Sequence, residues 1–148
     1  MANNYTRSSV ALTVNEEQER FLKDAGELAD CIDDGSEPVV PEWAGELARS
    51  VSDYGWGWQM TTYPVSPGTI YVYSEETANV EGMALLLTEY LCRFDPKGCI
   101  MVTWALTCSS PRPDEFGGGG MLVYAKETIW LDVQDELRKI LHSDQEEG

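Results

Sequence analysis

Basic side chains are scarce in this sequence. Its 148 residues include 10 Lys and Arg against 26 Asp and Glu, so the formal net charge is 10 − 26 = −16. Proteins that hold nucleic acid neutralise phosphates with Lys and Arg, and polybasic membrane-surface proteins use the same residues. The charge balance therefore argues against nucleic acid or an anionic membrane as the direct partner.

Long apolar runs are also missing. The most apolar stretch, Met83–Leu87, is five residues long and is flanked by Glu81 and Glu89, whereas a membrane-spanning helix needs about 20 apolar residues. The segment Met1–Arg7 lacks the basic start and apolar run of a signal peptide. We therefore expect a cytoplasmic protein without a membrane segment.

The sequence has few residues for metal or nucleophilic chemistry. Cys31, Cys92, Cys99 and Cys108 are spaced by 61, 7 and 9, which matches no zinc template, and His142 is the only histidine. We expect no metal, no cofactor, and reduced, mostly buried thiols. Cys108, at a predicted strand end, leaves a small enzyme using Cys108 or the carboxylates as an alternative.

The composition nevertheless predicts a folded protein. Hydrophobic residues make up 43% of the chain, with 5 Trp, 7 Tyr and 3 Phe, which is ample for a core. We expect a single domain, residues 1–148. Residues 1–12 have no apolar periodicity and are predicted to form a loose arm; residues 143–148 form an acidic tail.

Helical patterns begin directly after that arm. Thr13 and Glu16 have capping-box spacing, and the apolar stripe that follows predicts a helix ending near residues 33–36. Pro41 suits the start of a second helix, which closes at Tyr54 and Gly55. Residues 13–54 are therefore predicted to form a helical pair.

Alternation replaces the helical period from residue 55. We expect a hairpin over 56–73 with Trp56 and Trp58 in the core, a helix over 79–94, strands over 99–108 and 121–126, and a helix over 132–141. That last helix should bury Val133, Leu137, Ile140 and Leu141. Residues 109–120 should be irregular, with Gly117–Gly120 allowing close approach to other backbone or to a partner.

These elements predict an α+β fold. Residues 55–142 form a ββαββα core with a four-stranded, largely antiparallel sheet and helices on one face, and the N-terminal acidic helical pair joins it. The oligomeric state stays open, although a strand at 69–73 on the sheet edge would allow pairing between copies.

One segment resembles proteins of a known kind. Trp104–Gly119, WALTCSSPRPDEFGGG, together with Tyr73–Glu76 and Asn79-Val80, is similar to small uncharacterised acidic proteins of phages, plasmids and other bacterial mobile elements. The resemblance covers roughly residues 69–141 and brings no activity with it. It implies a mobile-element protein, and such small acidic proteins often inhibit host defence, as anti-CRISPR and anti-restriction proteins do.

The negative charge is densest outside the resembling segment. Residues 15–46 contain 11 acidic and 2 basic side chains, 2 − 11 = −9. A dense carboxylate array can occupy a Lys- and Arg-lined channel made for nucleic acid and can speed encounter with it. The predicted partner-binding residues are Glu16, Glu19, Glu27, Asp30, Asp33, Asp34, Glu42 and Glu46, with Arg112, Asp114 and Phe116 on the 109–116 loop.

The leading hypothesis is thus a non-enzymatic inhibitory binding protein. Its acidic surface would engage a basic nucleic-acid-handling protein, a nuclease or surveillance complex, as a nucleic-acid mimic does. A toxin-neutralising immunity protein would also bind its target through an acidic surface, so it is an alternative. Acidity that serves only solubility is another, and it predicts carboxylates spread evenly over the fold.

Overall fold

The computed structural model describes residues 4–62, 68–108 and 117–147. The elements, in chain order, are β1 (Asn4–Thr13), α1 (Glu16–Asp33), the 3-10 turn η1 (Glu42–Ala44), α2 (Gly45–Tyr54), β2 (Gln59–Thr62), β3 (Thr69–Ser74), α3 (Val80–Phe94), β4 (Cys99–Cys108), β5 (Gly117–Tyr124), β6 (Thr128–Asp132) and α4 (Val133–Glu147).

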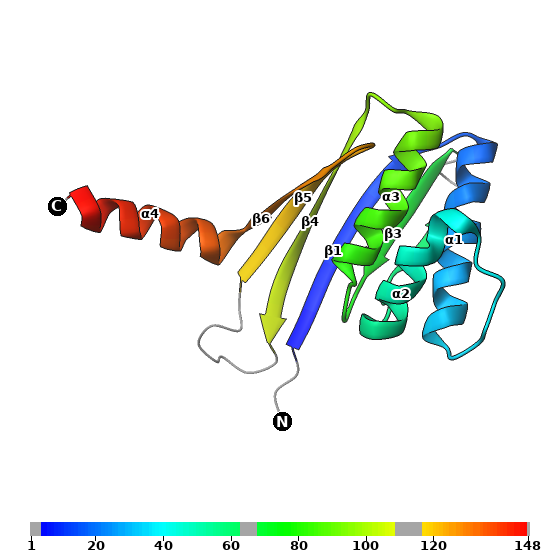
Figure 1. Cartoon of the computed structure of the whole chain (residues 1–148), viewed down its shortest axis with the longest axis horizontal. Coiled ribbons are helices and arrows are strands. Elements are labelled where there is room, and N and C mark those ends of the chain that lie inside the picture. Colours follow the sequence, from blue (N-terminus) through cyan, green and yellow to red (C-terminus); the bar gives the residue numbers. More distant parts are fainter. Residues whose placement is uncertain (1–3, 63–67, 109–116, 148) are drawn as a thin grey trace.

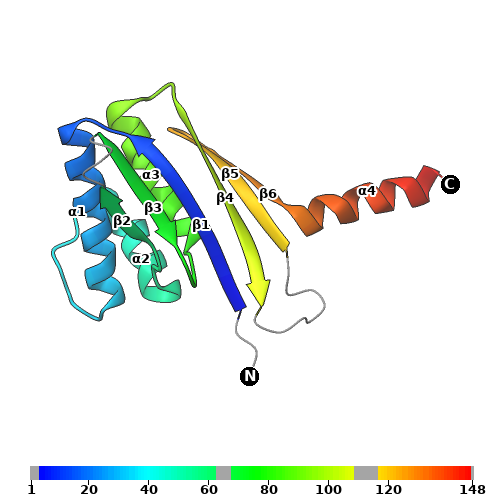
Figure 2. The same ribbon diagram turned by 180° about the vertical axis from the view of Figure 1, so that it is seen from behind.

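One antiparallel sheet holds all the described strands, in the order β2-β3-β1-β4-β5-β6. Helices α1, α2 and α3 cover one face, and no helix covers the other face within the described residues (Figures 1 and 2). The α+β class is confirmed. The sheet, however, has six strands rather than the four expected, because β1 and β6 were not predicted.

The loose arm predicted for residues 1–12 is wrong for the part that is described. Asn4–Thr13 is a central strand, paired to β3 on one side and to β4 on the other. Every second side chain of this strand faces the helical layer and is half-buried: Thr6, Ser8, Val10 and Leu12. Two of these four are polar, so the alternation carries little hydrophobic contrast in the sequence.

The predicted helices α1, α2 and α3 are confirmed with small shifts at their ends. The N-cap of α1 is Asn15 rather than Thr13, and its capping box is completed by Gln18. The apolar stripes that predicted these helices form the core with the inner residues of the sheet; Trp56 and Trp58 are buried there, as expected.

The glycine run is sheet rather than irregular chain. Gly117–Gly120 pair with β4 from Leu106 back to Thr103. A Cβ on Gly119 would lie 2.5 Å from the Leu131 carbonyl oxygen and 2.9 Å from the Trp104 ring, and one on Gly118 2.6 Å from the Trp104 carbonyl oxygen. The glycines therefore do allow close backbone approach, as predicted, but within a strand.

The C-terminal helix also departs from expectation. α4 extends to Glu147, beyond the predicted end at 141, and it projects past β6 away from the sheet (Figure 1). Val133, Leu137, Ile140 and Leu141, predicted to point inward, are 42–61% exposed. Within the described residues, no helix is long and apolar enough to cross a membrane.

A single buried side chain joins several elements. The Asn79 amide nitrogen donates to the Gly55 carbonyl (2.8 Å) and to Ser50 Oγ (3.0 Å), while the Gly82 N–H donates to Asn79 Oδ1 (2.9 Å) and caps α3. The Asn79 backbone binds both tryptophans: its N–H donates to the Trp56 carbonyl and its carbonyl accepts from Trp58 Nε1. Asn79 thus fixes the end of α2, the segment leading into β2, and the start of α3.

Replacing this side chain should destabilise the whole fold. Asn79→Ala leaves the Gly82 N–H and the Gly55 carbonyl unpaired and is expected to lower the free energy of unfolding by about 2–4 kcal/mol. Ser50→Ala removes one of the hydrogen bonds and should lower it by about 0.5–1.5 kcal/mol. Denaturant unfolding measures the free energy of unfolding of both variants. Equally small losses in Asn79→Ala and Ser50→Ala would show that Asn79 has no central role.

Candidate functional site

Carboxylates gather on the helical layer and on the connections. The six strands contain two charged residues between them, Arg7 and Asp132. Helix α1 alone carries seven acidic side chains, three of them in its first turn. The charge is therefore unevenly distributed, and the outer face of the sheet is nearly free of it.

The residues predicted to bind a partner do not form one site. Glu16 and Glu19 lie in the first turn of α1, and Glu19 is paired with Lys23 (3.1 Å). Glu42 and Glu46 lie at η1 and at the start of α2. Arg112, Asp114 and Phe116 lie outside the described residues.

The remaining four predicted residues do lie together. Glu27, Asp30, Asp33 and Asp34 are exposed at the C-terminal end of α1 and line one shallow cavity. Among the described residues none of them forms an ion pair, and the last turn of α1 has no basic residue. At about 1.5 Å per residue, these four residues lie about 17–27 Å along the helix axis from Glu16.

Two further carboxylates extend this cluster. A groove of about 480 Å³ is lined by Asp30 and Asp33 of α1 and by Glu75 and Glu76 after β3. Gly55–Gln59 also line it, and Asn79 binds this segment at Gly55, Trp56 and Trp58. We call Glu27, Asp30, Asp33, Asp34, Glu75 and Glu76, with the groove between them, the acidic groove.

The unpredicted strand β1 binds the chain at Glu76, one of the residues that line the acidic groove. The Thr6 N–H donates to the Glu76 carbonyl (2.6 Å), and the Ala78 N–H donates to the Thr6 carbonyl (3.3 Å). Glu75 and Glu76 follow β3 directly, and the sequence alone marks them only as an ordinary acidic turn. Their place in the site depends on the pairing of β1, so sequence reasoning missed them.

The electrostatics of the acidic groove are unfavourable to the folded chain. Partial burial, and then the negative charges of Asp33, Asp34 and Glu27, raise the pKa of Asp30 above its usual value. The C-terminal end of a helix also carries partial negative charge, so carboxylates there are destabilising. Repulsion at such a cluster is relieved when a cation or a basic partner binds.

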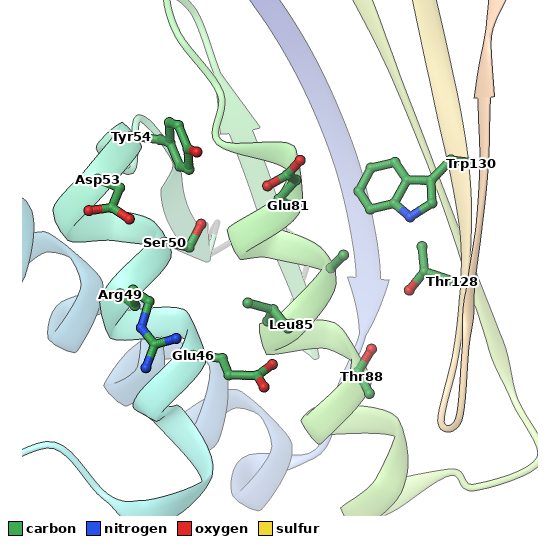
Figure 3. Close-up of a pocket in the computed structure, with 11 residues that line it drawn as sticks. Glu46, Arg49, Ser50, Asp53, Tyr54, Glu81, Leu85, Thr88, Thr128 and Trp130 are labelled. Carbon is green, nitrogen blue, oxygen red and sulfur yellow. The ribbon is translucent and has the colours of Figure 1, made fainter.

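A second cavity lies between α2, α3 and β6 (Figure 3). It has a volume of about 440 Å³, and its charged lining residues are Glu46, Arg49, Asp53 and Glu81. Trp130 of β6 faces α3 across this space (Figure 3). An arginine lies among its carboxylates, so the negative charge is less concentrated here than in the acidic groove.

The residues considered for catalysis are dispersed. Cys108 is at the end of β4, whereas His142 is exposed on the projecting helix α4. The prediction of mostly buried thiols is wrong, since Cys92 and Cys99 are exposed and Cys31 and Cys108 are half-buried. No disulfide joins these four cysteines in the part of the chain that the structure describes. Within the described residues, no three His, Cys, Asp or Glu side chains are placed to hold a metal ion.

Comparisons with protein-family models, with curated proteins and with solved structures find no match.

The raised pKa of Asp30 predicts a stability that depends on pH. The native state binds the Asp30 proton more tightly than the unfolded chain does, so the ionised carboxylate destabilises the folded protein at pH 7. This destabilisation is lost as the pH falls through the raised pKa of the folded state and then through the ordinary pKa of the unfolded chain. Asp30→Asn should raise the free energy of unfolding at pH 7 by about 0.3–1 kcal/mol. The gain should vanish at about pH 3.

Denaturant unfolding at the two pH values measures this effect, and Glu17→Gln in the first turn of α1 is the matched control. That variant removes a charge from the favourable end of the helix and should be neutral or slightly destabilising. If Asp30→Asn is less stable than wild type at pH 7, the Asp30 carboxylate does not destabilise the folded protein and the prediction is wrong.

Proposed function

We propose that the protein is a non-enzymatic binding protein that inhibits a basic, nucleic-acid-handling protein through its acidic groove. The observation that carries the proposal is the concentration of six carboxylates at one end of the molecule, with no ion pair to any of them among the described residues. Three of them, Asp30, Asp33 and Asp34, lie in the last turn of α1 or at its C-cap, where the helix dipole opposes negative charge.

This placement favours a binding role over a purely solubilising one. Charges that serve only solubility need no particular position, and the first turn of α1 is a more stable place for them than its last turn. A basic surface would gain from the concentrated negative potential in both encounter rate and specificity. Removal of the like-charge repulsion at Asp30 would add to the binding free energy.

The partner class follows from the same chemistry. A Lys- and Arg-lined channel that holds nucleic acid presents several cations along a path, and a row of carboxylates can replace the phosphates there. Together with the resemblance to mobile-element proteins, this favours a host defence nuclease or surveillance complex, as for anti-restriction and anti-CRISPR proteins. A toxin bound in the same way would make the protein an immunity protein.

The test compares two triple variants with the same change in charge. Asp30→Asn/Asp33→Asn/Asp34→Asn removes three charges from the acidic groove, and Glu16→Gln/Glu17→Gln/Glu19→Gln removes three from the opposite end of α1. Binding to a panel of purified restriction nucleases, CRISPR surveillance complexes and nuclease toxins is measured by pull-down and then by titration at rising salt.

We expect the Asp triple variant to weaken binding by about tenfold or more and the Glu triple variant by less than about threefold, with wild-type affinity falling as salt rises. Loss of folding cannot mimic this result, because removing carboxylates from the C-terminal end of a helix stabilises it. Equal losses in the two variants, or affinity indifferent to salt, would refute the role of the acidic groove.

A further inference from the structure

Apolar side chains are exposed at one edge of the sheet. Within the described residues β6 pairs only with β5, so its other edge has no partner strand. Ile129, Trp130 and Leu131 are 49%, 46% and 50% exposed. Monomeric proteins protect such edges with charges, prolines or bulges. In β6 the one charged residue is Asp132, at its end, and there is no proline.

The outer face beside this edge is hollowed and apolar. Met101, Ile129, Leu131 and Val133 line a groove of about 400 Å³, and none of its lining residues is charged. Met101 is 66% exposed. We call this hollow the apolar groove. The apolar groove has no carboxylate in its lining for a basic partner to bind, and it is therefore distinct from the acidic groove.

Helix α4 continues the apolar surface. Val133, Leu137, Ile140 and Leu141 follow the i, i+4, i+7, i+8 spacing of one helix face and are exposed. Both views show α4 extending beyond β6, away from the other strands, on the side where a further strand would pair (Figures 1 and 2). Helix α4 therefore lies where a neighbour on the β6 edge would be (Figures 1 and 2).

The exposed area is sufficient for a stable interface. Met101, Ile129–Leu131, Val133 and the three further residues of α4 together expose roughly 900 Å², taking roughly 200 Å² for one fully exposed large apolar residue. A standard interface buries about 800 Å² on each partner.

We propose that β6, the apolar groove and α4 form the interface of a symmetric homodimer. The two β6 strands pair antiparallel about a two-fold axis at Trp130, and each α4 lays its apolar face over the apolar groove of the other copy. In this register Ile129 lies opposite the partner's Leu131, and Asp132 lies opposite the partner's Thr128. No like charges oppose each other across the strands, although each chain carries −16.

Light scattering on the full chain tests the assembly. Wild type at tens of micromolar should have a mass of 2 × 16.5 = 33 kDa, against 16.5 kDa for one chain. Leu131→Asp, and separately Leu137→Glu/Ile140→Glu, should be monomers with an unchanged circular dichroism spectrum, since these side chains are at least half exposed in one chain. Val39→Asp, at a 95% exposed position outside the patch, is the control and should stay dimeric.

Disulfide trapping tests the two-fold register. Directly opposed residues of an antiparallel pair have Cα atoms about 4.5–5.5 Å apart, within the range of a disulfide. In a Cys92→Ser/Cys99→Ser background, Trp130→Cys should form a covalent dimer on mild oxidation and Ile129→Cys should not. A monomeric wild type, a Leu131→Asp dimer, or equal trapping of the two cysteine variants would overturn the proposal.

Discussion

The hydrogen bonds of Asn79 are the interaction on which most of this structure depends. The side chain of one buried residue caps α3 and binds the end of α2, and its backbone binds the carbonyl of Trp56 and the indole of Trp58. These bonds fix the chain at Gly55, Trp56 and Trp58, which line the acidic groove. Gly82 is required beside it, because a Cβ there would lie 2.9 Å from the Asn79 amide nitrogen. Stability and the shape of the site therefore depend on the same residue.

Strong helical signals were readable from the sequence, and weak strand signals were not. The capping residues and wide apolar stripes of α1 and α3 predicted both helices to within a few residues. β1 mixes Thr and Ser with Val and Leu on its inner face, so it lacks the contrast that marks a half-buried strand. β6 exposes most of its residues and is five residues long, too short to show a period.

The candidate site was predictable only where it lies within one helix. Glu27, Asp30, Asp33 and Asp34 are close in sequence, so their clustering followed from helical spacing. Glu75 and Glu76 join them because Thr6 of β1 binds the chain at Glu76, a contact between residues 70 positions apart. Glu16 and Glu19 were grouped with the cluster by composition, yet about two turns of α1 or more separate them from it. A strand at 69–73 was considered for pairing between copies, but β3 lies between β2 and β1. The edge strands of the described sheet are β2 and β6, and β6 is the one with exposed large apolar side chains.

Two chemically different surfaces result from this arrangement. The helical layer carries the carboxylates, whereas the β6 edge, the apolar groove and the exposed face of α4 are apolar. In the proposed dimer the apolar surfaces of the two copies cover each other, and two acidic grooves remain available to basic partners. Binding of a multisubunit or symmetric target would then gain from bivalency.

The most direct measurement of the central claim is carboxyl footprinting of the protein, free and in complex with a basic nuclease or surveillance complex of the proposed class. Carbodiimide labelling followed by mass spectrometry reads the accessibility of each Asp and Glu. The account predicts that labelling of Glu27, Asp30, Asp33, Asp34, Glu75 and Glu76 falls on binding, while that of Glu16 and Glu17 is unchanged. Protection of the first turn of α1 with no change in the acidic groove would contradict it.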